Sequence, residues 1–137
     1  YKRPATPFVA SFIGENNRLV GTVVGHERGH AVVRFADGGT LFAPQQTGCS
    51  VGAGVTFNLR PESIRLAGPN PLPGTQQAAA RVVDTVYLGD QNRVVLEATG
   101  IGRLVLKANA EDATAVAPGD SVTIEMPVSA CRLLACA

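Results

Sequence analysis

The strongest constraint on the fold is that the two halves of the chain repeat one pattern. Residues 21–35, GTVVGHERGHAVVRF, parallel residues 80–97, ARVVDTVYLGDQNRVVLE, because each has a Val-Val strand, a polar turn and a second Val-Val strand. Residues 51–66 and 116–134 also match, since in each a glycine precedes a short alternating strand, a proline and a closing Arg-Leu. These similarities predict a duplicated β unit of about 50–60 residues. If each unit closes into a small barrel, its sheet has no exposed edge.

Within each half, apolar residues alternate with polar ones, which is typical of half-buried strands. In VTFNL, for example, Val55, Phe57 and Leu59 are expected to face inward. Valine is the favoured apolar residue, which suits a pleated surface. Residues 109–116 are compatible with either a helical turn or a loop. The strands are predicted at residues 19–25, 30–35, 40–43, 55–59, 79–89, 92–98, 102–108 and 121–126.

A linker separates the two halves. Residues 67–77, AGPNPLPGTQQ, hold three prolines and two glycines, a composition that interrupts strands. We therefore expect a first OB-like subdomain at residues 18–68, a linker at 69–77 and a second OB-like subdomain at 78–137. The predicted fold class is all-β, with two small barrels in tandem.

The first residues have a helical pattern instead. In residues 7–17, PFVASFIGENN, Phe8 and Phe12 are four apart and Ile13 lies beside them, so they form one apolar stripe. A threonine and a proline precede the stripe and Gly14 follows it, which are typical start and stop signals of a helix. A helix of two turns is marginal in water and needs a surface to pack against.

Charge and composition disfavour several classes of function. The 137 residues carry 12 basic and 11 acidic side chains, and only 5% are aromatic, with no tryptophan. Such a surface gives no electrostatic or stacking reason to expect a nucleic-acid partner. The cysteines, Cys49, Cys131 and Cys136, have no C-x-x-C spacing, which favours thiols in a reducing compartment. No apolar run approaches the ~20 residues of a membrane-spanning helix.

No motif predicts catalysis, a cofactor or a metal. Residues 48–52, GCSVG, match G-x-S-x-G, but a nucleophile at Ser50 needs a helix after it, and a strand pattern follows instead. His26 and His30 are spaced H-x-x-x-H, yet glycines on both sides disfavour the helix that a zinc site of this type needs. No phosphate-binding glycine motif is present.

The segment LRPESIRL, residues 59–66, carries more information. Arg60 and Arg65 flank Glu62 directly after a predicted strand. Two interpretations remain open. The three residues form a local ion-pair corner that closes the first barrel, or the arginines are a contact site that recognises carboxylates on a partner.

Four stretches together resemble one family: residues 1–17, 59–66, 86–97 and 118–134. In this order they are similar to the C-terminal half of ATP-binding subunits of ABC importers of the spermidine/putrescine, iron or sugar type. That half carries the TOBE (transport-associated OB) domain. The resemblance spans essentially the whole chain, and residues 1–17 match the segment that joins the domain to the ATPase half.

The resemblance implies a non-catalytic regulatory and dimerisation domain that is not itself an enzyme. ATP and magnesium are then expected only in the missing N-terminal ATPase domain, and no cofactor is expected in this fragment. The implied partners are the ATPase domain, a second copy of the chain and the permease subunits. The implied location is cytoplasmic and membrane-associated, on the inner face of the membrane. The alternative is a ligand-binding domain that senses a small oxyanion or the transported substrate.

On this basis we expect interface or regulatory residues in three places: the apolar stripe of the first helix, the corner after the strand at 55–59, and the YLGD turn. These residues are Phe8, Phe12, Ile13, Arg60, Glu62, Arg65, Tyr87, Gly89 and Asp90.

Overall fold

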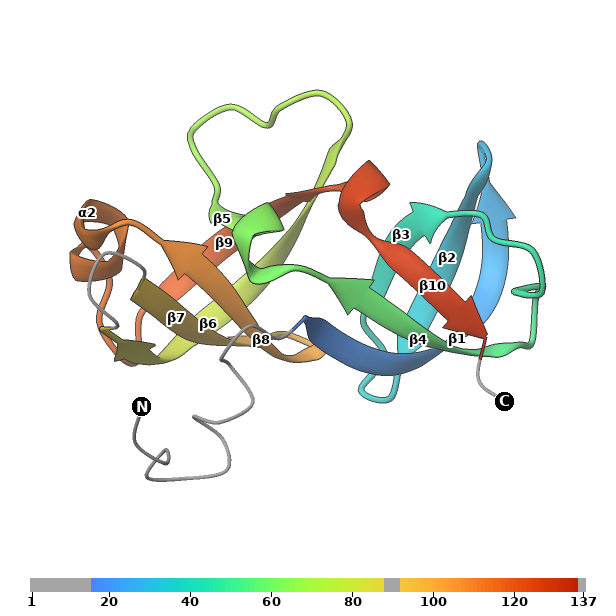
Figure 1. Ribbon diagram of the computed structural model, residues 1–137, viewed down its shortest axis with the longest axis horizontal. Coiled ribbons are helices and arrows are strands. Elements are labelled where there is room, and N and C mark those ends of the chain that lie inside the picture. The colour runs from blue at the N-terminus through green and yellow to red at the C-terminus, as the bar shows by residue number, and fades with distance from the viewer. Residues whose placement is uncertain (1–15, 88–91, 136–137) are drawn as a thin grey trace.

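The computed structural model describes residues 16–87 and 92–135, which form two strongly curled antiparallel sheets at opposite ends of an elongated molecule (Figure 1). The first sheet has the strand order β10-β4-β1-β2-β3. Its strands are β1 (Asn17–Glu27), β2 (His30–Phe35), β3 (Thr40–Pro44), β4 (Gly54–Leu59) and β10 (Arg132–Ala135).

The second sheet has the equivalent order β5-β9-β6-β7-β8. Its strands are β5 (Arg65–Leu66), β6 (Thr75–Val86), β7 (Asn92–Ala98), β8 (Gly102–Ala108) and β9 (Ser121–Pro127). The short helices are η1 (Pro61–Ser63), α2 (Ala110–Thr114) and η2 (Val128–Ala130). Each sheet also has one bulge in its longest strand, between Val23 and Gly25 in β1 and between Val82 and Asp84 in β6. The repeat in the sequence is therefore a repeat in the structure.

The all-β prediction with two OB-like sheets is confirmed, and β2, β7 and β8 have the predicted bounds. The segment left open at residues 109–116 contains a helical turn, because the Asn109 side chain caps α2 by accepting a hydrogen bond from the Asp112 N–H. The strand predicted at 79–89 is β6, which begins at Thr75. The helix predicted within residues 7–17 falls almost entirely outside the described residues.

The last strand of each half belongs to the sheet of the other half. β5 comes after the strands of the first sheet but pairs with β9 in the second. Reciprocally, β10 comes after the strands of the second sheet but pairs with β4 in the first, as its path in Figure 1 shows. The sequence division at residues 69–77 does not describe this exchange. Each sheet is completed by a strand from beyond the linker.

One apolar cluster runs through both sheets, since it includes Phe57 of β4 and Leu96 of β7. The inward orientation predicted for Val55, Phe57 and Leu59 is confirmed, because all three are buried. The hairpin turns of the two sheets also touch, where the Gly39 N–H donates to the Gly100 carbonyl at 2.8 Å. A side chain at Gly39 would lie 2.7 Å from the Gly100 backbone, so the contact requires glycine.

Candidate functional site

The seam between the two sheets is held by a side-chain amide at the start of each half. Asn17 begins β1, and its side chain is buried against the edge strand β8 of the other sheet. Its Nδ2 donates to the Val105 carbonyl at 2.9 Å, and the Val105 N–H donates to its Oδ1 at 2.8 Å. Asn17 thus supplies the pair of hydrogen bonds that a neighbouring strand would otherwise make.

Gln76 makes the matching contact from the second half. It lies near the start of β6, and its Nε2 donates to the Phe42 carbonyl of β3 at 2.7 Å. In return, the Phe42 N–H donates to Gln76 Oε1, also at 2.7 Å. The two amides therefore clamp the edge strand of each sheet to the opposite half. Together with the strand exchange, they make the two sheets one structural unit.

A third polar cluster surrounds Glu125, which is fully buried in β9. Its Oε2 accepts hydrogen bonds from the Arg65 guanidinium, with Arg65 Nε at 2.8 Å. Its Oε1 accepts from the Leu72 N–H at 3.2 Å and the Thr75 hydroxyl at 3.2 Å, and also from Gln77 Nε2 at 3.3 Å. The Arg65 hydrogen bond outweighs burial and holds the pKa of the Glu125 carboxyl below its ordinary value. Glu125 thereby joins the exchanged strand β5 to the linker.

Two hollows lie beside these contacts. One, of about 800 Å³, runs along the seam and is lined by residues of both halves, including His30 and Phe42 on one side and Gln76 on the other. The second, of about 670 Å³, lies on the second sheet, where Arg81 and several hydroxyl groups share the lining with Glu97. Both are open hollows rather than enclosed sites.

The predicted interface residues that the structure describes do not form one cluster. Arg60, directly before η1, and Glu62, within it, are exposed, and Tyr87 is 57% exposed after β6. Arg65 binds Glu125 from the other half of the sequence, not Glu62, so the ion pair at this corner is long-range. The remaining predicted residues lie outside the described residues: Phe8, Phe12, Ile13, Gly89 and Asp90.

The described residues offer no arrangement for metal binding, since none of their His, Cys, Asp and Glu side chains gather in threes. Ser50 precedes a turn and then β4 rather than a helix, so the G-x-S-x-G match lacks its structural context. His26 and His30 lie on strands at the β1–β2 hairpin. Burial raises the pKa of the Cys131 thiol to about 12, which leaves it unreactive at neutral pH. Nor, within the described ranges, does any helix have the length and apolarity that a membrane span requires.

Sequence reasoning missed Gln76 and Glu125 as structural centres. The available signal was the repeat itself, because aligning β1 with β6 places Asn17 opposite Gln76 and thus an amide at the same position in both halves. Glu125 gave no signal, since an acidic residue in an alternating strand is normally interpreted as solvent-exposed.

Comparisons with known proteins identify the family. The family described as the TOBE domain matches residues 57–134. The spermidine/putrescine import ATP-binding protein PotA of Rubrobacter xylanophilus is 38% identical over 98% of this chain, and that of Roseobacter denitrificans is 30% identical over 98%. The chain spans only about a third of the length of these relatives, 35% and 38% respectively.

Among solved structures, the cytoplasmic molybdate-binding protein ModG, with molybdate bound, has a similar fold. The TM-score is 0.75 at 17% sequence identity, and the match covers 85% of this chain and 94% of that one. At this identity the likeness concerns the fold alone.

Proposed function

This chain belongs to the TOBE domain family, and we propose that it is the non-catalytic regulatory domain of the ATP-binding subunit of an ABC importer. The observation that carries the proposal is the match of nearly the whole chain to two import ATP-binding proteins. The polar clusters at the seam support a structural role, because each of them joins strands rather than presenting a reactive group. Hydrolysis of ATP would then be the task of the ATPase domain.

The partners follow from the same proposal. The domain contacts its own ATPase domain, pairs with a second copy in a homodimer and acts with permease subunits, on the cytoplasmic face of the membrane. The strand exchange supports such a role, since β5 and β10 tie each sheet to the other half of the chain.

Two measurements test this proposal. The gene upstream of the codon for Tyr1 is expected to encode an ATPase with a phosphate-binding P-loop. Light scattering of the parent protein is expected to give the mass of a dimer, and removal of residues 18–137 is expected to weaken that dimer. An upstream sequence without an ATPase would refute the proposal, whereas a dimer unaffected by the truncation would refute only the pairing role.

A second candidate function is the binding of a small oxyanion. The fold neighbour is a molybdate-binding protein. In this chain the hollow on the second sheet combines Arg81 with the hydroxyl groups of Thr99, Ser121 and Thr123, although the carboxylates of Asp37 and Glu97 also line it, the latter paired with Arg103. Arginine and hydroxyl donors suit an oxyanion. Thermal unfolding with molybdate, sulfate or phosphate tests this, with Arg81→Gln as the control that should lose any stabilisation. The absence of any shift in the unfolding temperature would refute it.

A further inference from the structure

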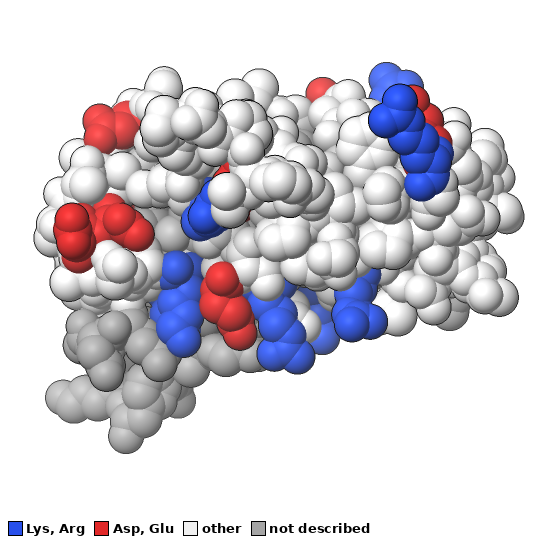
Figure 2. Space-filling model, turned by 90° about the horizontal axis from the view of Figure 1, so that it is seen from above, with Lys and Arg blue, Asp and Glu red and all other residues white. Residues whose placement is uncertain are grey.

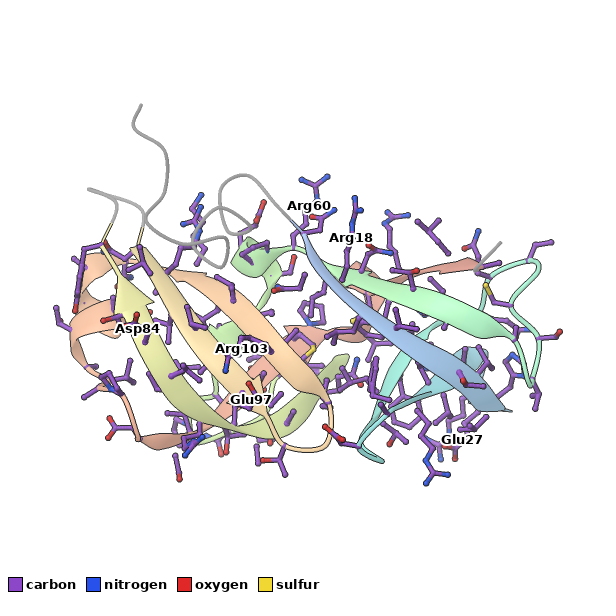
Figure 3. All side chains as sticks on the ribbon, turned by 90° about the horizontal axis from the view of Figure 1, so that it is seen from below. Arg18, Glu27, Arg60, Asp84, Glu97 and Arg103 are labelled. Carbon is purple, nitrogen blue, oxygen red and sulfur yellow. The ribbon has the colours of Figure 1, made fainter. Side chains whose placement is uncertain are left out.

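The outer face of the first sheet carries a row of arginines. Arg18, Asn58 and Arg132 lie directly opposite one another on β1, β4 and β10. Directly opposite residues of antiparallel strands point to the same side of a sheet, and the neighbouring Leu59 and Leu133 are buried, so this row faces outward. Figure 3 shows Arg60, at the end of β4, projecting to the same side as Arg18.

The next row of the same face has an aliphatic side chain on each side of a threonine. Val20, Thr56 and Leu134 lie opposite one another on the same three strands. Val20 is 73% exposed and Leu134 is 62% exposed, which leaves two large aliphatic side chains in water beside the arginines. We call the two rows, together with Arg60, the first outer face.

The first outer face has no acidic residue in either row. Across the described ranges, neither Arg18 nor Arg132 takes part in an ion pair. The acidic residues Glu111 and Asp112 belong to α2, at the far end of the second sheet. Seen from above, several basic side chains lie along one long edge, with one acidic side chain among them, and further acidic side chains lie at the end that carries the second sheet and beside the basic ones at the other end (Figure 2). The first outer face is therefore a cationic and aliphatic surface.

On the equivalent face of the second sheet, the arginine has a carboxylate partner within the same chain. There Glu125 takes the position of Asn58, between Gln77 and Arg65. Its carboxylate binds Arg65 and also the Leu72 N–H of the linker, so that the linker is hydrogen-bonded to the same carboxylate as the arginine. In the first sheet the arginine is retained as Arg132, but Asn58 takes the place of the carboxylate, and within the described ranges its side chain donates to the Thr56 carbonyl of its own strand rather than joining a linker.

We propose that the first outer face binds an extended segment of a partner protein, in which a carboxylate is flanked by aliphatic side chains. The carboxylate lies between Arg18 and Arg132, where guanidinium groups bind it with paired hydrogen bonds. The aliphatic side chains pack on Val20 and Leu134. A second copy of this chain is a poorer occupant, because a two-fold axis through the face would place arginines against arginines.

The test is a binding measurement with two fluorescein-labelled peptides. The probe peptide has one glutamate between valines, and the control peptide has glutamine in its place. Fluorescence anisotropy with this chain is expected to show saturable binding of the glutamate peptide with a Kd of about 1 mM or below, and binding of the glutamine peptide about tenfold weaker. Equal binding of the two peptides, or no saturable binding of the glutamate peptide, would overturn the proposal.

Four variants locate the site. Arg132→Gln is expected to weaken binding of the glutamate peptide about tenfold, whereas Arg103→Gln, at an exposed position on β8 of the second sheet, is expected to leave it unchanged. Asn58→Glu places a carboxylate beside Arg132, as Glu125 lies beside Arg65, and is expected to abolish binding without lowering the unfolding temperature. Asn58→Gln is its neutral control. Unchanged binding in both Arg132→Gln and Asn58→Glu would refute the proposed location.

Light scattering distinguishes the competing occupant. If the first outer face joined two copies of the chain, Val20→Ser would lower the mass measured at high protein concentration. That result would overturn the proposal in favour of self-association. We expect the mass to be the same for Val20→Ser and the unaltered chain.

Discussion

Replacing Asn17 with alanine tests whether the amide clamp holds the two halves together. The change removes both hydrogen bonds to the Val105 backbone, at 2.9 and 2.8 Å, in a buried position. Each bond contributes about 0.5–1.5 kcal/mol net, and a buried backbone group left without a partner costs about 1–3 kcal/mol. Water that enters the space left by the side chain will form some of the hydrogen bonds that the Val105 backbone loses. We therefore expect a loss of about 2–4 kcal/mol in the free energy of unfolding.

Urea unfolding measures this loss. For an m-value of about 2 kcal/mol/M, the midpoint should fall by about 1–2 M. Asn16→Ala is the matched control, because Asn16 is the exposed neighbour on the same chain segment and its replacement should change the stability by less than about 0.5 kcal/mol. Equal midpoints for the Asn17 and Asn16 variants would refute the clamp as a source of stability.

Three further changes probe other contacts. Glu125→Gln removes a carboxylate whose pKa is lowered by folding. The loss of stability relative to the unaltered chain should therefore be complete above the unfolded-state pKa of about 4.3 and should vanish as the pH falls through the lower folded-state pKa. Thermal unfolding across this pH range measures the loss, and a loss that does not change with pH would contradict the expectation. Gly39→Ala should lower the free energy of unfolding measured in urea by about 1–3 kcal/mol, because its Cβ would lie 2.7 Å from the Gly100 backbone. Gly68→Ala is the control and should leave the stability unchanged, because Gly68 has open space around it. Equal effects of the two substitutions would refute the steric reason. Cys131, with a pKa of about 12, should react with a thiol reagent at pH 8 about a thousandfold more slowly than a free cysteine. Mass spectrometry that resolves the labelled site measures the rate. Rapid labelling of Cys131 in the folded protein would contradict its burial.

The strands could be predicted from the sequence because their signal is local. Alternation at Val55, Phe57 and Leu59 is visible within five residues, and the repeat shows where the pattern begins again. Residue ranges for β2, β7 and β8 followed directly. The same local signal indicated the two OB-like sheets and, through the resemblance, the family.

The strand exchange could not be predicted in this way. β5 has only two residues, too few to show alternation, and β10 has four. Which sheet such a strand joins is decided by tertiary contacts, among them the pairing of Arg65 with Glu125 across the linker. For the same reason the partner of Arg65 could not be identified from the sequence. The nearest acidic residue along the chain is Glu62, whereas in the folded chain Arg65 pairs with the distant Glu125.

The candidate site was predicted only in part. Arg60 was singled out as a carboxylate-binding residue, and it lies on the same side as Arg18, which the sequence did not single out. The arginines of the first outer face come from β1, from the residue after β4 and from β10, so no spacing along the chain could have grouped them. The interface roles of Glu62 and Tyr87 stay predictions.

Under the proposed function, this domain regulates an ATPase without taking part in its chemistry. The most direct measurement is the rate of ATP hydrolysis by the parent subunit with and without residues 18–137, alongside substrate uptake by the importer reconstituted in vesicles. We expect the shortened subunit to retain ATP hydrolysis, and uptake to lose its normal coupling to hydrolysis. Loss of hydrolysis in a shortened subunit that still folds and binds ATP would contradict the claim, because it would place part of the chemistry in this domain.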